Sequence, residues 1–123
     1  MVIFGVPGAF TGVCTNAHVP EYVKEYDTFK ELGVDSVACI SVNDPYTVKA
    51  WASSMPGAEG KIEFLADPSG AWTRMLGLEK DLSGAALSHR SNRYSMYIED
   101  GQLIAVRPPY RAPLVCRGAH WEL

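Results

Sequence analysis

The stretch VIFGVPGAFTGVCT, residues 2–15, sets the local plan of this chain. Residues 2–6 form a short apolar run of the kind that fills a buried strand. Pro7 and Gly8 then predict a tight turn, and Cys14 follows at the head of a run with helical spacing. We therefore predict a strand, a loop and a helix in succession, with a thiol where the loop meets the helix.

Helices and strands alternate along the residues that follow. Apolar residues recur at helical spacing from Cys14 to Leu32, and Pro20 predicts a bend or restart within that helix. The later predicted elements are a buried strand at 34–42, a helix at 46–55 capped by Asn43 or Asp44, a strand at 61–67, a short helix at 71–76, a loop at 79–92 and a hairpin at 93–106 turned by Asp100 and Gly101. This order predicts an α/β protein with a thioredoxin-like fold, in which helices flank a central mixed sheet that ends in an antiparallel hairpin.

The length of 123 residues suits one folded domain, which we place at residues 1–106. Residues 107–123 contain three prolines and no clean periodicity, so they form an atypical tail. Three interpretations of this tail remain open: a loosely ordered segment, a docking segment, or sequence foreign to the domain.

Composition excludes several classes of function. The net charge is −3 and no basic stripe is visible, so neither nucleic acid nor a membrane surface is an expected partner. No apolar run approaches the roughly 18 residues of a membrane span. The chain has three cysteines, Cys14, Cys39 and Cys116, and an odd count without a secretory signal argues against a disulfide scaffold. None belongs to a C-x-x-C pair, which argues against a zinc ribbon and a thioredoxin-type dithiol. We expect a reducing compartment.

Cys14 is the candidate nucleophile. The thiolate is the reactive form of cysteine, and a helix N-terminus or a nearby cation favours it. Thr11 can offer its hydroxyl to the sulfur or to an incoming oxygen, while Pro7 and Phe10 can shield the sulfur from water. The competing interpretation is a small core cysteine at a strand–helix junction, because free cysteine is among the most buried residue types.

A family resemblance favours the reactive interpretation. PGAFTGVC at 7–14, followed by TNAHVPEY, CISVND, KAWA, LADPSGAW and RYSMYIEDG, resembles the peroxiredoxin family, in its atypical type-5-like (type II) branch. The resemblance runs from about Met1 to Val106, where members usually have further residues before the first strand. It implies that Cys14 is the peroxidatic cysteine and that no metal or organic cofactor is needed. Gly12 replaces a proline that is common in the family, and the tail departs from the family pattern.

The resemblance also assigns the neighbours of Cys14. Arg93 would lie over the sulfur, Thr11 would bond the sulfur and the peroxide, and Pro7 would shield the sulfur. Arg90 is the competing candidate for the active-site cation. His18 and Phe10 are expected near the site, with a hydrogen-bonding role for His18, and Cys39 reads as a core filler. Phe10 and Trp72 are candidate contacts of a homodimer.

The function implied is a thiol-dependent peroxidase that reduces hydrogen peroxide and alkyl hydroperoxides. Its reductant would be thioredoxin, glutaredoxin or glutathione, and Cys116 is a candidate resolving cysteine. The alternatives are a catalytically impaired fragment that acts as a redox-sensing or binding protein, and a disulfide oxidoreductase. We expect a cytoplasmic protein, or one of mitochondria or another organelle if an N-terminal segment is missing.

Overall fold

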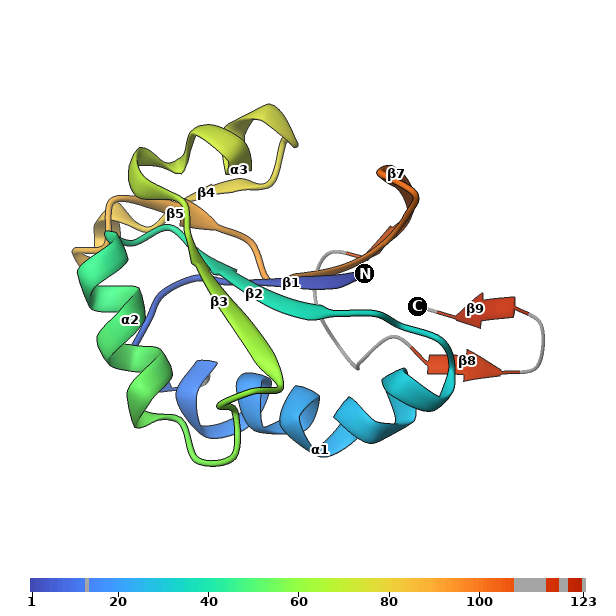
Figure 1. Ribbon diagram of the computed structural model, residues 1–123. Coiled ribbons are helices and arrows are strands. Elements are labelled where there is room, and N and C mark those ends of the chain that lie inside the picture. Colours follow the sequence, from blue (N-terminus) through green and yellow to red (C-terminus); the bar gives the residue numbers. More distant parts are fainter. Residues whose placement is uncertain (13, 108–114, 118–119, 123) are drawn as a thin grey trace.

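The computed structural model describes residues 1–12, 14–107, 115–117 and 120–122. A five-stranded mixed sheet forms its centre, in the order β3-β2-β1-β6-β7 (Figure 1). Its strands are β1 (Val2–Val6), β2 (Val37–Ser41), β3 (Ile62–Ala66), β6 (Tyr94–Glu99) and β7 (Gln102–Arg107). β1, β2 and β3 run parallel, and β6 is antiparallel to both β1 and β7. This is the mixed sheet with an antiparallel hairpin that the sequence predicts.

Helices cover the two faces of this sheet unequally. The helices α1 (Val19–Glu31) and α2 (Pro45–Ser54) lie on one face, and the short α3 (Ala71–Met75) lies on the other (Figure 1). Side chains of β1 point alternately to these two faces. Val2 and Phe4 pack in the hydrophobic cluster under α1 and α2, whereas Ile3 packs in the cluster on the other face, against which Trp72 lies. The continuous apolar run at 2–6 is therefore explained by burial on both sides.

The predicted restart near Pro20 is confirmed. A single π-helical turn, η1 (Cys14–His18), directly precedes α1, and Pro20 lies in the first turn of α1. The cap of α2 is Asp44 rather than Asn43, because the Asp44 carboxylate accepts a hydrogen bond from the Thr47 N–H at 2.9 Å.

The predicted loop at 79–92 is wrong. β4 (Glu79–Asp81) and β5 (His89–Ser91) pair as a separate antiparallel ladder, and the 3₁₀ turn η3 (Ser83–Ala85) joins them. Strands of three residues with charged side chains lack the apolar alternation by which a strand is recognised. The hairpin at 93–106 was predicted correctly, since Asp100 and Gly101 have φ values of +49° and +76°, as a type I′ turn requires.

Two further short elements complete the description. A 3₁₀ turn, η2 (Pro68–Gly70), precedes α3, and in the tail β8 (Val115–Arg117) pairs with β9 (His120–Glu122). Arg107, the first residue of the predicted tail, ends β7, and residues 108–114, 118–119 and 123 lie outside the described part, so the boundary between residues 1–106 and 107–123 stays a prediction. Within the described residues, no helix combines the length and the apolar character needed to cross a membrane.

Candidate active site

Cys14 lies at the start of η1 and is fully buried, with 0% of its surface exposed. The Arg93 guanidinium reaches this thiol, and Arg93 Nη1 donates a hydrogen bond to Cys14 Sγ at 3.3 Å. The contact joins residues 79 positions apart because β6, which begins directly after Arg93, pairs with β1 at Gly5 and Tyr94. The fold therefore brings the predicted nucleophile and the predicted cation together.

Arg90, the competing cation, has a different set of partners. Arg90 Nε donates to the Leu87 carbonyl at 2.8 Å, and Arg90 Nη1 donates to the Val42 carbonyl at 2.9 Å. The bond to Leu87 lies within the β4–β5 hairpin, and the bond to Val42 ties that hairpin to the residue after β2. Of the two arginines, Arg93 is thus the one that contacts the sulfur.

The loop between β1 and η1 is stabilised by hydrogen bonds to its own backbone carbonyls. Thr11 Oγ1 donates to the Gly8 carbonyl at 2.7 Å, and the Thr15 N–H donates to the Thr11 carbonyl at 3.0 Å. The hydroxyl hydrogen of Thr11 is therefore directed to Gly8 rather than to the sulfur, which leaves its oxygen able to accept a hydrogen bond from a substrate. Phe10, predicted to shield the sulfur, instead has 55% of its surface exposed and a left-handed φ of +62°.

Asn43 braces the same loop, a role that the sequence analysis missed. Asn43 Oδ1 accepts hydrogen bonds from the Ala9 N–H at 3.0 Å and from Ser41 Oγ at 2.5 Å. The contact between Asn43 and this loop could have been predicted from the order of the strands. β1 and β2 are parallel neighbours, and the loops after their carboxyl ends meet at one edge of the sheet. Asn43 therefore fixes the loop that carries Thr11.

α2 also contacts the turn that carries the thiol. Trp51 Nε1 donates a hydrogen bond to Thr15 Oγ1 at 3.1 Å, and the Trp51 side chain is fully buried. Thr15 directly follows Cys14, so a tryptophan lies one residue from the candidate nucleophile.

His18 lies one turn after Cys14, at the end of η1. It is 2% exposed, and its ring packs edge-on against Phe4 and Tyr22, with centroid distances of 5.3 and 5.8 Å. Burial, with a smaller contribution from the Arg93 charge, lowers the pKa of His18 to about 3. His18 is therefore neutral at neutral pH and adds no positive charge beside the sulfur. Its predicted hydrogen-bonding role stays a prediction.

The other two cysteines differ in what the structure describes. Cys39 is 1% exposed in the middle of β2, and burial, together with the nearby Cys14, raises the pKa of its thiol. This is the environment expected of a core filler. Cys116 lies in β8, but its side chain is outside the described part. Its role as a resolving cysteine therefore stays a prediction. Among the described residues, no group of three or more His, Cys, Asp or Glu side chains could hold a metal ion.

A pocket of about 380 Å³ opens at Arg93, the residue that contacts Cys14. Pro7, Thr11 and Arg93 line one part of it, so the structure gathers three predicted site residues around one cavity. The remaining wall was not predicted, and it consists of Lys80, Leu82, Leu87 and Asn92. Most of these residues belong to the β4–β5 hairpin, which sequence reasoning took for a loop. Cys14 is not part of the wall, and Arg93, which lines the pocket, also contacts the sulfur.

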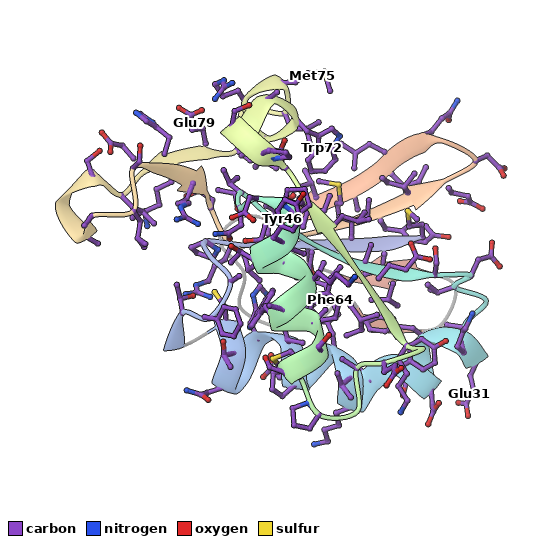
Figure 2. All side chains as sticks on the ribbon, turned by 60° about the vertical axis from the view of Figure 1, so that its left-hand side comes forward. Glu31, Tyr46, Phe64, Trp72, Met75 and Glu79 are labelled. Atoms are coloured by element: carbon purple, nitrogen blue, oxygen red, sulfur yellow. The ribbon has the colours of Figure 1, made fainter. Side chains whose placement is uncertain are left out.

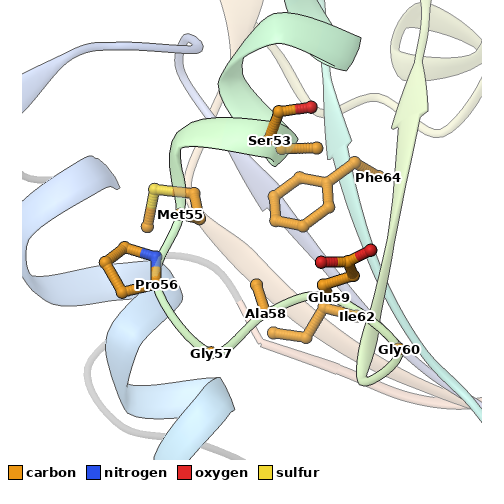
Figure 3. A pocket seen from close by; sticks show the side chains of 10 residues that line it. Ser53, Met55, Pro56, Gly57, Ala58, Glu59, Gly60, Ile62 and Phe64 are labelled. Atoms are coloured by element: carbon orange, nitrogen blue, oxygen red, sulfur yellow. The ribbon is translucent and has the colours of Figure 1, made fainter.

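A larger pocket, of about 540 Å³, lies elsewhere on the chain. Figure 3 shows it between the end of α2, the loop that follows, and β3, with Met55 and Phe64 on opposite sides. Its lining includes one ionisable side chain, Glu59, and none of the predicted site residues. The smaller pocket is therefore the better candidate for chemistry at Cys14.

Residues 1–112 match the sequence profile of the Redoxin family. A mitochondrial Peroxiredoxin-2F from Arabidopsis thaliana is 53% identical over 106 residues, which are 86% of this chain and 52% of that protein. Reduced Prx3 from Vibrio vulnificus in complex with hydrogen peroxide has 40% identity and a TM-score of 0.80, over 86% of this chain and 64% of that one. Peroxiredoxin 5 from Alvinella pompejana has 44% identity and a TM-score of 0.79, over 86% and 68%. This chain thus spans about half the length of the curated relative.

Proposed function

We propose that this chain, which belongs to the peroxiredoxins of the Redoxin family, is a thiol-dependent peroxidase with Cys14 as its nucleophile. The observation that carries the proposal is the 3.3 Å contact between Arg93 Nη1 and Cys14 Sγ, next to a pocket lined by Pro7 and Thr11. The substrates are hydrogen peroxide and alkyl hydroperoxides. The Vibrio relative, whose structure contains hydrogen peroxide, supports this substrate class.

The first step oxidises the sulfur. The Cys14 thiolate attacks the terminal oxygen of the hydroperoxide, a sulfur–oxygen bond forms, and the oxygen–oxygen bond breaks. The electron pair of the broken bond leaves with the inner oxygen, which takes up a proton and becomes water or an alcohol. Cys14 is left as a sulfenic acid, the reversible first stage of cysteine oxidation.

Arg93 and Thr11 act on the charges of this step. The guanidinium is permanently charged and has five N–H donors, so it can stabilise the thiolate with one donor and the departing oxygen with others. Thr11 Oγ1 accepts a hydrogen bond from the O–H of the hydroperoxide, since its own hydrogen is committed to the Gly8 carbonyl. Pro7 forms the part of the wall that limits water at the reacting atoms.

The second stage returns the thiol. A reductant thiol attacks the sulfenic sulfur, water leaves, and a mixed disulfide forms. A second thiol then releases the Cys14 thiol and carries away the new disulfide, so one hydroperoxide consumes two thiols. Thioredoxin, glutaredoxin or glutathione is the proposed source of these thiols. Cys116 is retained as a candidate for an internal resolving thiol.

Two further proposals concern assembly and location. Phe10 is a candidate contact of a homodimer because over half of its surface is exposed. Trp72 is a weaker candidate, since it lies between α3 and the sheet and packs against the Tyr94 ring, with their centroids 6.4 Å apart (Figure 2). The mitochondrial name of the Arabidopsis relative supports an organelle over the cytoplasm as the location.

A second function is favoured by one observation, the complete burial of Cys14. In that case the chain has the peroxiredoxin fold but reacts slowly with peroxide, and it acts as a redox-sensing protein. Slow oxidation of Cys14 then changes the binding of the chain to a partner. The two functions differ in rate and in turnover.

The experiment is peroxide consumption with dithiothreitol as the reductant. We expect turnover by the wild-type chain, loss of turnover in Cys14→Ser, and dimedone trapping at the peptide that contains Cys14. Cys116→Ser tests the resolving thiol, and mass spectrometry of the oxidised protein maps any disulfide formed. Oxidation no faster than that of a free thiol would replace the peroxidase with the redox-sensing function.

A further inference from the structure

We propose that the pocket lined by Thr11 and Arg93 is a binding site for organic hydroperoxides that carry a carboxylate, with the carboxylate at Lys80 and the apolar body against Leu82 and Leu87. The inference rests on the proposed peroxidase function and adds a substrate class to it. Three properties of the pocket support it: its volume, its apolar wall and the sign of its charge.

The volume exceeds what hydrogen peroxide needs. A water molecule occupies about 30 Å³ of liquid volume, and hydrogen peroxide has only two oxygen atoms. The pocket of about 380 Å³ is several times larger than such a molecule and falls in the size range of sites for organic ligands. A substrate that fills it must therefore bring an organic body beside its peroxide group.

The apolar wall is built by the turn of the β4–β5 hairpin. Leu82 and Leu87 flank η3, both are half-buried, and the Leu87 N–H donates to the Leu82 carbonyl at 3.1 Å. The neighbours Ala86 and Ser88 have left-handed φ values of +60° and +58°, which are costly for residues other than glycine. A strained, hydrogen-bonded turn of this kind holds the two leucines toward the pocket in a fixed arrangement.

The charge of the wall is positive. Its seven residues include two cations, Lys80 and Arg93, and no acid. β4 consists of Glu79, Lys80 and Asp81. Because side chains alternate along a strand, the two acids point to the opposite side from Lys80. Glu79 is already engaged there, since its carboxylate lies 2.9 Å from His89 Nδ1 and 3.4 Å from Arg74 Nη1.

Lys80 also faces a like charge. It is the ladder partner of Arg90, and like charges directly opposite in an antiparallel pair repel each other. Arg90 uses its donors on the Leu87 and Val42 carbonyls, and neither of the two salt bridges in the described part of the chain involves Lys80. A carboxylate placed at Lys80 would relieve this repulsion. A neutral substrate of the same shape would not.

The test uses three forms of one molecule. The probes are 4-carboxycumyl hydroperoxide, its methyl ester and cumene hydroperoxide, which share the reacting group and the apolar body. Oxidation of Cys14 by each is followed by stopped flow, and the ratio of the acid rate constant to the ester rate constant is the readout. We expect the acid to be favoured about threefold to fivefold, the size of an exposed ion pair, and we expect high salt to reduce the preference.

Two variants assign the preference to the pocket. Lys80→Gln should bring the acid-to-ester ratio to about one, and Lys80→Glu should invert it. Lys24→Gln, a change of an exposed lysine on α1, is the matched control and should keep the wild-type ratio. Leu87→Ala should slow all three organic probes about fivefold relative to hydrogen peroxide, because part of the apolar wall is lost.

A binding measurement separates this proposal from the peroxidase itself. The product alcohol of the carboxylate probe should shift the backbone amide resonances of Lys80, Leu82 and Leu87, and the methyl ester should shift them less at equal concentration. If none of the hydroperoxides oxidises Cys14 but the alcohol binds in this way, the peroxidase function fails and the carboxylate site stands. An acid-to-ester ratio of one in the wild type, or a ratio unchanged in Lys80→Gln, would overturn the carboxylate site even if the peroxidase is fast.

Discussion

His18 gives the folded chain a pH dependence whose sign and size follow from its surroundings. The side chain is 2% exposed, and burial with the Arg93 charge lowers its pKa from 6.5 to about 3. In the unfolded chain the ring is hydrated and titrates near its ordinary value. Between these two pKa values the unfolded state binds a proton that the folded state does not bind, so acid favours unfolding.

The magnitude is set by the interval between the two pKa values. The contribution of His18 to stability is fully present above pH 6.5 and falls by about 1.4 kcal/mol for each pH unit below it. At pH 5 the loss amounts to about 2 kcal/mol, which is a large share of the roughly 5–15 kcal/mol that stabilises a typical domain. The loss continues until the pH reaches the folded pKa of about 3.

The assay is urea unfolding at pH 7.5 and pH 5, on the wild type and on His18→Phe. Phenylalanine keeps a ring against Phe4 and Tyr22 but cannot titrate. Any constant effect of the substitution cancels in the difference between the two pH values. We expect that difference to be about 2 kcal/mol smaller in His18→Phe than in the wild type. Tyr46→Phe, a change of an exposed aromatic ring, is the control and should retain the wild-type difference.

An equal pH difference in wild type and His18→Phe would refute the reasoning. It would mean that the folded protein admits a proton at His18 at no cost, so that the ring is hydrated or faces an acid. A larger difference in His18→Phe would refute it as well.

Three further outcomes are expected. Gly5→Ala should lower the free energy of unfolding by about 1–3 kcal/mol in urea titrations, since the added Cβ would lie 2.0 Å from Tyr94 Cε1. Asn43→Ala should slow the oxidation of Cys14 about tenfold in stopped flow, since the Ala9 N–H loses the acceptor that holds the loop. Arg93→Met should slow the same step about 10²-fold to 10³-fold, in line with the loss of a charged donor at the reacting atoms.

Matched controls accompany these changes. Gly84→Ala adds a Cβ with nothing within 4 Å and should leave stability nearly unchanged. Asp44→Ala removes the cap of α2 and should cost about 1 kcal/mol of stability without slowing oxidation tenfold. Arg74→Gln removes an exposed arginine and should leave the oxidation rate as it is. An Arg93→Met rate close to that of Arg74→Gln would remove Arg93 from the reaction.

Much of the fold could be predicted because its long elements carry regular patterns. The buried strand at 2–6, the helical spacing after Cys14 and the Asp100–Gly101 turn all have local signals that the structure follows. The β4–β5 hairpin could not be predicted in this way. Its three-residue strands are charged, and the bonds of Arg90 to the Leu87 and Val42 carbonyls, which hold it in place, depend on tertiary structure.

The residues of the candidate site likewise divide into those that were predicted from the sequence and those that were missed. Cys14 and Arg93 were predicted as a pair through the family resemblance, and β1–β6 pairing supplies the contact between them. Asn43 was predicted only as one of two helix caps, because its bond to Ala9 joins two loops that sequence alone does not place together. Lys80 and the two leucines were missed because they lie on the unpredicted hairpin.

The central claim is that Cys14 is a fast peroxide nucleophile. Reduced protein mixed with one equivalent of hydrogen peroxide tests it most directly, with tryptophan fluorescence and thiol loss as readouts. Trp51 is a suitable reporter, since its indole N–H donates to Thr15, the residue after Cys14. We expect a rapid single-exponential change that consumes one thiol and disappears in Cys14→Ser. A change no faster than the oxidation of a free thiol, or one that persists in Cys14→Ser, would contradict the claim.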